Sequence, residues 1–150
     1  MMIIRKAIKS DISAIAEMAI LMWGNNSIDD LTNEFENIID SNDGVIFIAD
    51  EKGKLIGFAQ CQLRYDYVEG TESSPVGYLE GIVVKEEYRN NGYAKSLLQE
   101  CEKWTMLKGC SEFASDCELN NNNSFNFHLT AGFKEANRII CFTKKLKRED

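Results

Sequence analysis

The sequence predicts an α+β fold, a mixed α/β layer in which helices flank a mainly antiparallel β-sheet. Some segments have apolar residues at three- and four-residue spacing, and others have short apolar runs of strand length. These segments follow one another in the order β-α-α-β-β-β-α-β-α-β. With 150 residues and a hydrophobic content of 44%, the chain is long and apolar enough for one core. We therefore expect residues 1–150 to form a single domain.

The first part of the chain predicts one strand and two helices. Residues 2–8 are mainly apolar and indicate the strand. Ser10 is expected to cap the first helix, which continues to Trp23, because apolar residues recur at helical spacing after it. The second helix is expected near residues 29–39, where apolar residues lie on one face.

The middle of the chain predicts a hairpin, a long loop and a third strand. Residues 45–49 and 55–63 are strand-like and are separated by a turn that contains Gly53. The polar segment 66–75 is long for a hairpin loop, and long loops in compact domains are often functional. Residues 77–84 form the next apolar strand.

The last third predicts a helix from Gly92 to near Gly109, a strand at 113–117, a short helix at 124–131 and a strand at 139–146. The strands on either side of the long helix complete a β-α-β unit, so we expect them to be parallel neighbours. Ligands of such sheets favour the crevice at the C-terminal ends of the strands.

Composition excludes several classes of function. The net charge of −7 disfavours nucleic-acid binding and suits a cationic substrate, although solubility alone also explains it. No apolar run approaches the length of a membrane span, and the N-terminus lacks the features of a signal peptide, so a cytoplasmic protein is expected. The five cysteines form no C-x-x-C pair, and there is one histidine, so no metal site is expected.

A turn made of Arg89, Asn90, Asn91 and Gly92 stands directly before the long helix. Helix N-termini present unpaired N–H groups and a positive dipole end, and a glycine leaves the backbone open to a ligand. These features indicate a site for phosphate or pyrophosphate. The turn is neither a Walker A loop nor a G-x-G-x-x-G motif, and an ordinary strand-helix connection explains it equally well.

The turn also resembles a family signature. The residues RNNGYA, Arg89 to Ala94, match the [QR]-x-x-G-x-[GA] loop of the GCN5-related N-acetyltransferases, in which backbone amides bind the pyrophosphate of acetyl-CoA. Asn121, Ser124 and His128, with the Gly-Phe pair at 132–133, are similar to a second segment of that family. The resemblance covers nearly the whole chain and implies the family's fold.

The stretches YDYVEGTESSPVGYLEGI, FASDCEL and NNNSFNFHLTAGFKE resemble the aminoglycoside 6′-N-acetyltransferases more closely. This resemblance implies direct transfer of an acetyl group from acetyl-CoA to the 6′-amine of an aminoglycoside in a ternary complex, and a homodimer. Three alternatives stay open. In the first, the acceptor is another cationic amine: a polyamine, a small metabolite or a protein N-terminus. In the second, the chain is a non-catalytic acyl-CoA-binding module. In the third, which the sequence supports less well because a phosphate-loop lysine is missing, the chain binds nucleotides.

The resemblance also implies the residues of the site. Residues that match the acetyl-CoA groove are Ile82, Val83, Val84, Arg89, Asn90, Asn91, Gly92, Tyr93, Ala94, Asn121 and Ser124. Residues that match acceptor-binding positions are Trp23, Tyr67, Glu80, Asp116 and Glu135.

Two residues are candidates for proton transfer. Glu80 lies inside an apolar strand, where burial would raise the pKa of a carboxylate towards that of a general base. It acts as a base directly or through water, or it binds the substrate ammonium; a strand-end carboxylate paired with a lysine is the structural alternative. His128 stands where many relatives have a tyrosine that is proposed to protonate the CoA thiolate. The structural alternative is that His128 only packs at the cofactor groove.

Overall fold

The computed structural model describes residues 2–148. The chain divides into two compact units, Met1–Asp116 and Cys117–Asp150. Among the described residues, the first unit contains a five-stranded sheet and three α-helices, and the second contains one α-helix. The candidate substrate residues Trp23, Glu80 and Asp116 all belong to the first unit.

The sheet has the strand order β1-β2-β3-β4-β5. The first three pairings are antiparallel, and β4 pairs with β5 in parallel, as the β-α-β unit predicted. The predicted mainly antiparallel sheet is therefore confirmed. The strands are β1 (Met2–Lys6), β2 (Gly44–Glu51), β3 (Lys54–Arg64), β4 (Val76–Val84) and β5 (Phe113–Ser115).

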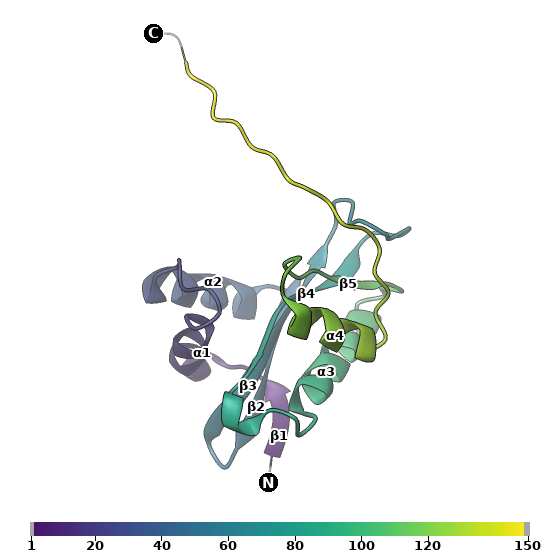
Figure 1. Cartoon of the computed structure of the whole chain (residues 1–150). Coiled ribbons are helices and arrows are strands. Elements are labelled where there is room, and N and C mark those ends of the chain that lie inside the picture. Colours follow the sequence, from purple (N-terminus) through teal and green to yellow (C-terminus); the bar gives the residue numbers. More distant parts are fainter. Residues whose placement is uncertain (1, 149–150) are drawn as a thin grey trace. The chain divides into compact units, whose positions relative to one another are not determined.

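Helices cover both faces of this sheet. Two of them pack on one face and the third packs on the other (Figure 1). Their bounds are α1 (Ile12–Ala19), α2 (Ile28–Asp40) and α3 (Tyr93–Leu107), with α1 and α2 sharing a face; short 3₁₀ turns, η1 (Lys9–Asp11) and η2 (Glu86–Tyr88), precede α1 and α3.

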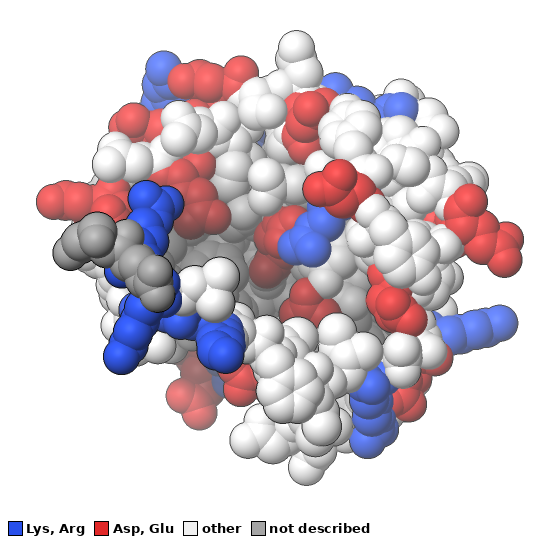
Figure 2. Space-filling model, turned by 90° about the horizontal axis from the view of Figure 1, so that it is seen from above, with Lys and Arg blue, Asp and Glu red and all other residues white. Residues whose placement is uncertain are grey.

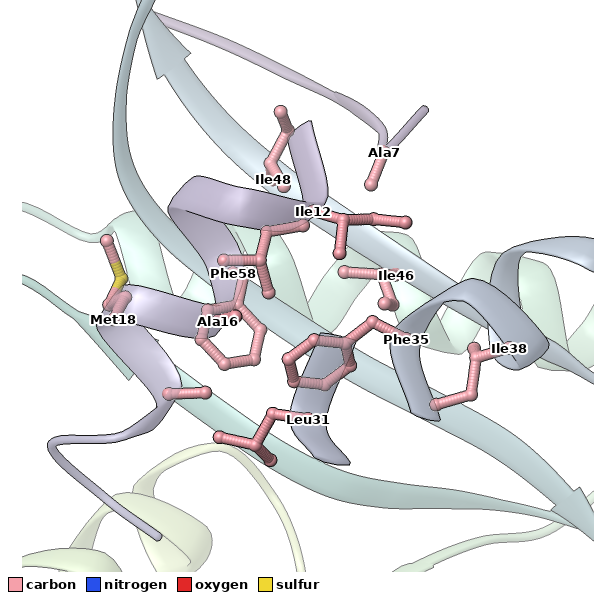
Figure 3. Packing of buried hydrophobic residues seen from close by; sticks show 12 residues of the cluster. Ala7, Ile12, Ala16, Met18, Leu31, Phe35, Ile38, Ile46, Ile48 and Phe58 are labelled. Carbon is pink, nitrogen blue, oxygen red and sulfur yellow. The ribbon is translucent and has the colours of Figure 1, made fainter. Parts of the chain in front are cut away.

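The core between the sheet and the α1–α2 layer is built from aliphatic and aromatic side chains (Figure 3). Phe35 of α2 and Phe58 of β3 are fully buried, with ring centroids 6.1 Å apart in an edge-to-face arrangement. This geometry suits the ring quadrupoles and fixes α2 against the middle of β3. The core therefore anchors the sheet from which the site residues project.

The contact between β4 and α3 shows which face of the sheet the residues of β4 point towards. A Cβ on Gly77 would lie 2.3 Å from Oγ1 of Thr105, so Gly77 faces α3 in close contact. Because side chains alternate along a strand, Tyr78 faces the opposite side, the side of α1 and α2. Leu97, Leu98 and Cys101 of α3 are buried.

The start and end of the first helix differ from the prediction. Ser10 lies in η1, and Asp11 is the residue that precedes α1. The prediction that Ser10 caps the helix is wrong because Asp11 folds the chain there: its carboxylate accepts the Ile8 N–H at 2.8 Å and binds Arg5. The helix ends at Ala19, and Trp23 follows in a turn.

The second unit contains α4 (Asn122–Thr130), which confirms the predicted short helix. The predicted strand at 139–146 is wrong, because residues 134–148 adopt no regular secondary structure (Figure 1). A strand needs a neighbour for its N–H and C=O groups, and no described strand of this chain pairs with the segment. Its large apolar side chains are exposed: Ile139, Ile140, Phe142 and Leu146.

Candidate active site

An irregularity in β4 places the candidate base. The β3–β4 register passes from Leu79 opposite Cys61 to Gly81 opposite Gln60, which leaves Glu80 as the extra residue of a β-bulge. A bulge interrupts the alternation of side chains and re-aims those next to it. The carboxylate in the apolar strand therefore sits where the strand changes direction.

The free edge of β4 begins at the same point. β5 has three residues and pairs only with Gly77, Tyr78 and Leu79. Residues 81–84 pair with β3 on one side, and within the described residues no strand pairs with their other side. Some of the N–H and C=O groups of Ile82, Val83 and Val84 thus point away from β3 and are open to an extended ligand.

The open edge leads along the chain to the N-terminus of α3. Gly92 precedes the helix with φ of 81°, a left-handed conformation that favours glycine, and no side chain caps the helix there. A Cβ on Gly92 would meet no atom within 4 Å, so the space in front of the helix is clear. The first N–H groups of α3 include those of Tyr93 and Ala94, and they have no partner within the helix.

Local hydrogen bonds hold the turn before Gly92. Asn90 adopts φ of 64°, which asparagine tolerates better than most residues. The Asn91 amide donates to the carbonyls of Tyr88 and Arg89, both at 3.1 Å. Nε of Arg89 donates to the carbonyl of Val84 at 3.0 Å, which ties the turn to the end of β4. The turn is therefore shaped before any ligand arrives, and it fits an anion such as pyrophosphate.

Trp23 packs over the bulge. A Cβ on Gly81 would lie 2.5 Å from the indole ring, so only a glycine at this position leaves room for the indole. The same ring contacts Phe35 and Phe58, with centroid distances of 6.5 and 6.4 Å. The sequence resemblance placed Trp23 in the site, and the structure brings it next to the residue that follows Glu80.

Both predicted acidic residues of the first unit have partners. Glu80 forms a two-point ion pair with Arg64, with Nε–Oε2 and Nη2–Oε1 distances of 3.0 and 2.6 Å. The partner of Glu80 is therefore an arginine of the neighbouring strand, whereas the structural alternative had expected a lysine. The Tyr78 hydroxyl donates a hydrogen bond to Oδ2 of Asp116. The Arg64 guanidinium lies 3.4 Å from the centroid of the Tyr78 ring, which joins the two pairs.

The pKa values of the connecting groups are raised. The hydrogen bond to Glu80 is the main cause of the raised pKa of Arg64. Burial, followed by the hydrogen bond to Asp116, raises the pKa of Tyr78 well above its usual value. Arg64 therefore stays a cation and Tyr78 stays a hydrogen-bond donor throughout the neutral pH range.

The long loop between β3 and β4 is tied down at both ends. Near its start, the Tyr65 hydroxyl donates to Asp43 at 2.9 Å. Near its end, the Glu112 carboxylate accepts the N–H of Glu72 at 2.9 Å. Tyr67, the loop residue predicted to bind substrate, is 75% exposed. The loop thus presents the Tyr67 ring to solvent from a fixed base.

In the second unit, the side chain of Asn121 caps α4 by accepting the N–H of Ser124 at 3.1 Å. Nδ1 of His128 lies 2.7 Å from the carbonyl oxygen of Ser124, and the ring contacts Phe133 at a centroid distance of 5.1 Å. Glu135 is paired with Arg138. These contacts give Asn121, His128 and Glu135 structural roles, and their functional roles stay predictions.

Acidic side chains are spread over the face shown in Figure 2, with basic side chains beside several of them.

Residues 2–148 contain no group of three or more His, Cys, Asp and Glu side chains that could hold a metal ion. Within the same residues, no helix combines the length and apolarity needed to span a membrane.

Arg64 and Tyr78 are the residues of this site that sequence reasoning missed. The nearest signal was the unexplained carboxylate in an apolar strand, which calls for a cationic partner. That signal does not identify the partner, because the long loop and the bulge prevent a prediction of the β3–β4 register from the sequence.

The chain belongs to the Acetyltransferase (GNAT) family, whose model matches residues 12–133. The resemblance that the sequence motifs indicated is therefore confirmed.

Its relatives include the aminoglycoside N(6′)-acetyltransferase type 1 of Stenotrophomonas maltophilia, 36% identical over 96% of this chain and 94% of that protein. The enzyme of the same name from Serratia marcescens is 39% identical over 83% and 86%. Among solved structures, AAC(6′)-Iy in complex with the bisubstrate analogue CoA-S-monomethyl-acetylneamine has a TM-score of 0.93 at 36% identity, covering 97% and 99% of the two chains. AAC(6′)-Ih from Acinetobacter baumannii has a TM-score of 0.92 at 34% identity, covering 98% and 100%.

The contact between Trp23 and Gly81 yields a prediction about packing. Gly81→Ala should force the indole away and destabilise the fold by about 1–3 kcal/mol, because the added methyl group overpacks the site. Urea unfolding measures the stability, and near-UV circular dichroism reports the indole environment. Gly24→Ala is the control, since its Cβ would meet the nearest atom at an ordinary 3.5 Å. Equal stability and spectra in the two variants would show that Trp23 does not pack on the bulge.

Proposed function

We propose that this protein transfers the acetyl group of acetyl-CoA to the 6′-amine of aminoglycosides. The observation that supports it best is the arrangement along β4: a carboxylate at the bulge, an open strand edge after it, and a bare helix N-terminus at its end. The first feature suits a cationic amine, and the other two suit an extended cofactor that ends in pyrophosphate. The names of the relatives support the same acceptor.

Acetyl-CoA would lie along the open edge of β4 and over the turn before α3. The strand residues 82–84 would bind the pantetheine arm through backbone groups and polarise the thioester carbonyl. Residues Arg89–Ala94 would bind the pyrophosphate at the helix N-terminus. The family resemblance assigns Asn121 and Ser124 to acetyl-CoA binding as well. The structures of AAC(6′)-Iy were solved with CoA or a CoA-containing analogue, which supports acetyl-CoA as the co-substrate.

The acceptor would bind on the α1–α2 side of β4. Aminoglycosides are rigid polycations, and carboxylates and aromatic faces recognise such ligands. Glu80 and Asp116 supply the charges, and Trp23 supplies an aromatic wall beside the bulge. Tyr67 would contact the acceptor from the loop, and the family resemblance assigns Glu135 to acceptor binding as well.

Transfer would be direct within a ternary complex. The neutral amine attacks the thioester carbon, the C–S bond breaks, and the CoA thiolate leaves while the amine gives up a proton. Holding both substrates in one cleft supplies much of the rate. Glu80 would accept the amine proton, directly or through water, or bind the ammonium beforehand. His128 would protonate the thiolate, although a thiolate is a good enough leaving group without it.

Two other functions make different predictions. A related enzyme for a polyamine, a small metabolite or a protein N-terminus would use the same groove with another acceptor. A non-catalytic module would bind acetyl-CoA without consuming it. An assay of acetyl-CoA consumption with kanamycin, tobramycin, spermidine and a peptide separates the three. Turnover with the aminoglycosides alone supports the proposal; turnover only with another amine, or binding without turnover, overturns it.

Glu80→Gln tests the role of the bulge carboxylate. The amide keeps the shape but accepts no proton and carries no charge, so kcat should fall by about 10²–10⁴-fold. Steady-state kinetics with an aminoglycoside measures the change. Glu36→Gln, on the exposed side of α2, is the matched control and should leave kcat unchanged. Near-normal turnover of Glu80→Gln would remove Glu80 from the chemistry.

Gly92→Trp tests the anion cradle. The indole would cover the N-terminus of α3, so the Kd for acetyl-CoA should rise at least tenfold in isothermal titration calorimetry. Gly53→Trp is the matched control, because Gly53 also has a positive φ (86°) and open space around its Cβ position, in the β2–β3 turn. If both variants bind acetyl-CoA alike, the cofactor does not use the turn.

We further propose that the protein is a cytoplasmic homodimer in which residues 1–150 of each copy form one domain. The family model matches residues 12–133 and so continues from the first compact unit into the second, which supports a single domain. The segment from Ile139 to Leu146 exposes large apolar side chains and has no pairing strand among residues 2–148, and a second copy would supply one.

Phe142→Glu tests the dimer, because a carboxylate at this 87% exposed apolar position would be desolvated in a chain–chain contact. Light scattering coupled to size-exclusion chromatography should give the dimer mass for the native chain and the monomer mass for the variant. Leu107→Glu, equally exposed at the end of α3, is the control and should stay dimeric. A native chain with the monomer mass would refute the proposal.

A further inference from the structure

The carboxylate of Glu80 is held at two points before any substrate binds. Both of its oxygens accept hydrogen bonds from the Arg64 guanidinium, at 3.0 and 2.6 Å. Such a fork-to-fork pair fixes the carboxylate in orientation as well as position. The Glu80 side chain is 19% exposed and that of Arg64 is 43% exposed, so the carboxylate is the more enclosed partner.

Tyr78 holds Arg64 in turn. The Arg64 guanidinium carbon lies 3.4 Å from the centroid of the Tyr78 ring, close enough for stacking and for a cation–π interaction. The register explains the contact: Arg64 pairs with Val76, and Tyr78 lies two residues further along β4. Diagonal neighbours on one face of an antiparallel pair are within reach of long and aromatic side chains.

The hydroxyl of Tyr78 extends this chain of contacts to the second carboxylate. Tyr78 is 6% exposed, and its hydroxyl donates to Oδ2 of Asp116. Glu80, Arg64, Tyr78 and Asp116 therefore form one connected series. Its two ends are the carboxylates that the proposed function assigns to the acceptor, and its middle members come from β3 and β4.

We propose that Arg64 and Tyr78 are positioning residues, which hold the Glu80 and Asp116 carboxylates in a fixed arrangement for a polycationic acceptor. The inference rests on the proposed function of the site. A glutamate at a bulge has several rotamers, and the Arg64 fork selects one of them before the substrate binds. Catalytic sites lose rate steeply when a group shifts by about 1 Å, by as much as 10²-fold.

Arg64 leaves room for the substrate on Glu80. An ionised carboxylate has about four lone-pair sites, and the guanidinium occupies two, so an incoming ammonium or hydroxyl has acceptors left. The opposite role for Arg64 is a competing cation that the substrate must displace. The two roles differ in sign: loss of a positioning residue lowers kcat/KM for the acceptor, whereas loss of a competitor lowers KM and raises kcat/KM.

Arg64→Gln in the full chain is the main test, with kinetics on the acceptor that the native protein uses best. The kcat/KM for that amine should fall by about 10–10²-fold, while the Kd for acetyl-CoA stays unchanged. Arg64→Lys keeps the charge without the fork and should recover only part of the loss. Arg5→Gln is the matched control: Arg5 also makes a two-point pair, with Asp11, and its loss should lower Tm without changing kcat/KM.

A double-mutant cycle shows whether Arg64 acts through Glu80. If it does, the Arg64→Gln/Glu80→Gln protein should be no slower than Glu80→Gln alone. Fully additive effects, an unchanged kcat/KM in Arg64→Gln, or a lower KM in that variant would each overturn the inference. Native protein that acetylates a different amine would refute the proposed acceptor alone, and the cycle is then decided on that amine.

Tyr78 supplies a second test that does not depend on Arg64 variants folding. Tyr78→Phe keeps the ring under Arg64 and loses the bond to Asp116, whereas Tyr78→Leu loses both. We expect Tyr78→Phe to raise KM for the acceptor with a small change in kcat, and Tyr78→Leu to lower kcat as well. Identical kinetics of the two variants would show that the ring does not position Arg64.

Discussion

The break in pairing at Glu80 is the constraint on which the rest of the site depends. A regular β4, paired on both sides along its length, would have no backbone groups to offer a ligand. The bulge shifts the register with β3 by one residue, and the short β5 ends the pairing on the other side after Leu79. One strand therefore provides core contacts in its first half and a candidate binding edge in its second.

Close packing makes this irregular strand possible. Gly77 allows Thr105 of α3 to approach one face of β4, and Gly81 allows the Trp23 indole to cover the other. Gly77 and Gly81, which have no side chains, thus allow the helical layers to pack closely against β4 before and after the bulge. The Phe35–Phe58 contact fixes the α1–α2 layer that supports Trp23. The same packing that stabilises the sheet places an aromatic wall next to Glu80.

The Glu80 carboxylate needs a cationic partner because it is largely buried. A carboxylate that is 19% exposed next to apolar residues is costly unless an opposite charge and hydrogen bonds accompany it. Arg64 provides both for Glu80, and the Tyr78 hydroxyl provides a donor for Asp116. The proposed site for a cationic ligand therefore includes one cation of its own, Arg64. In our proposal, the orientation of Arg64 lets it position Glu80 instead of competing with the ligand.

The sequence by itself determined the order of the elements as far as α4, the mainly antiparallel sheet, the parallel β4–β5 pair, the Gly92 turn and the family, because these depend on local periodicity, turn chemistry and linear motifs. It also named Trp23, Glu80 and Asp116. Only the tertiary structure decided the partner of Glu80, the link through Tyr78, and the absence of a strand at residues 139–146. Those depend on register and on which chain segments meet, and a strand-like pattern does not specify its neighbour.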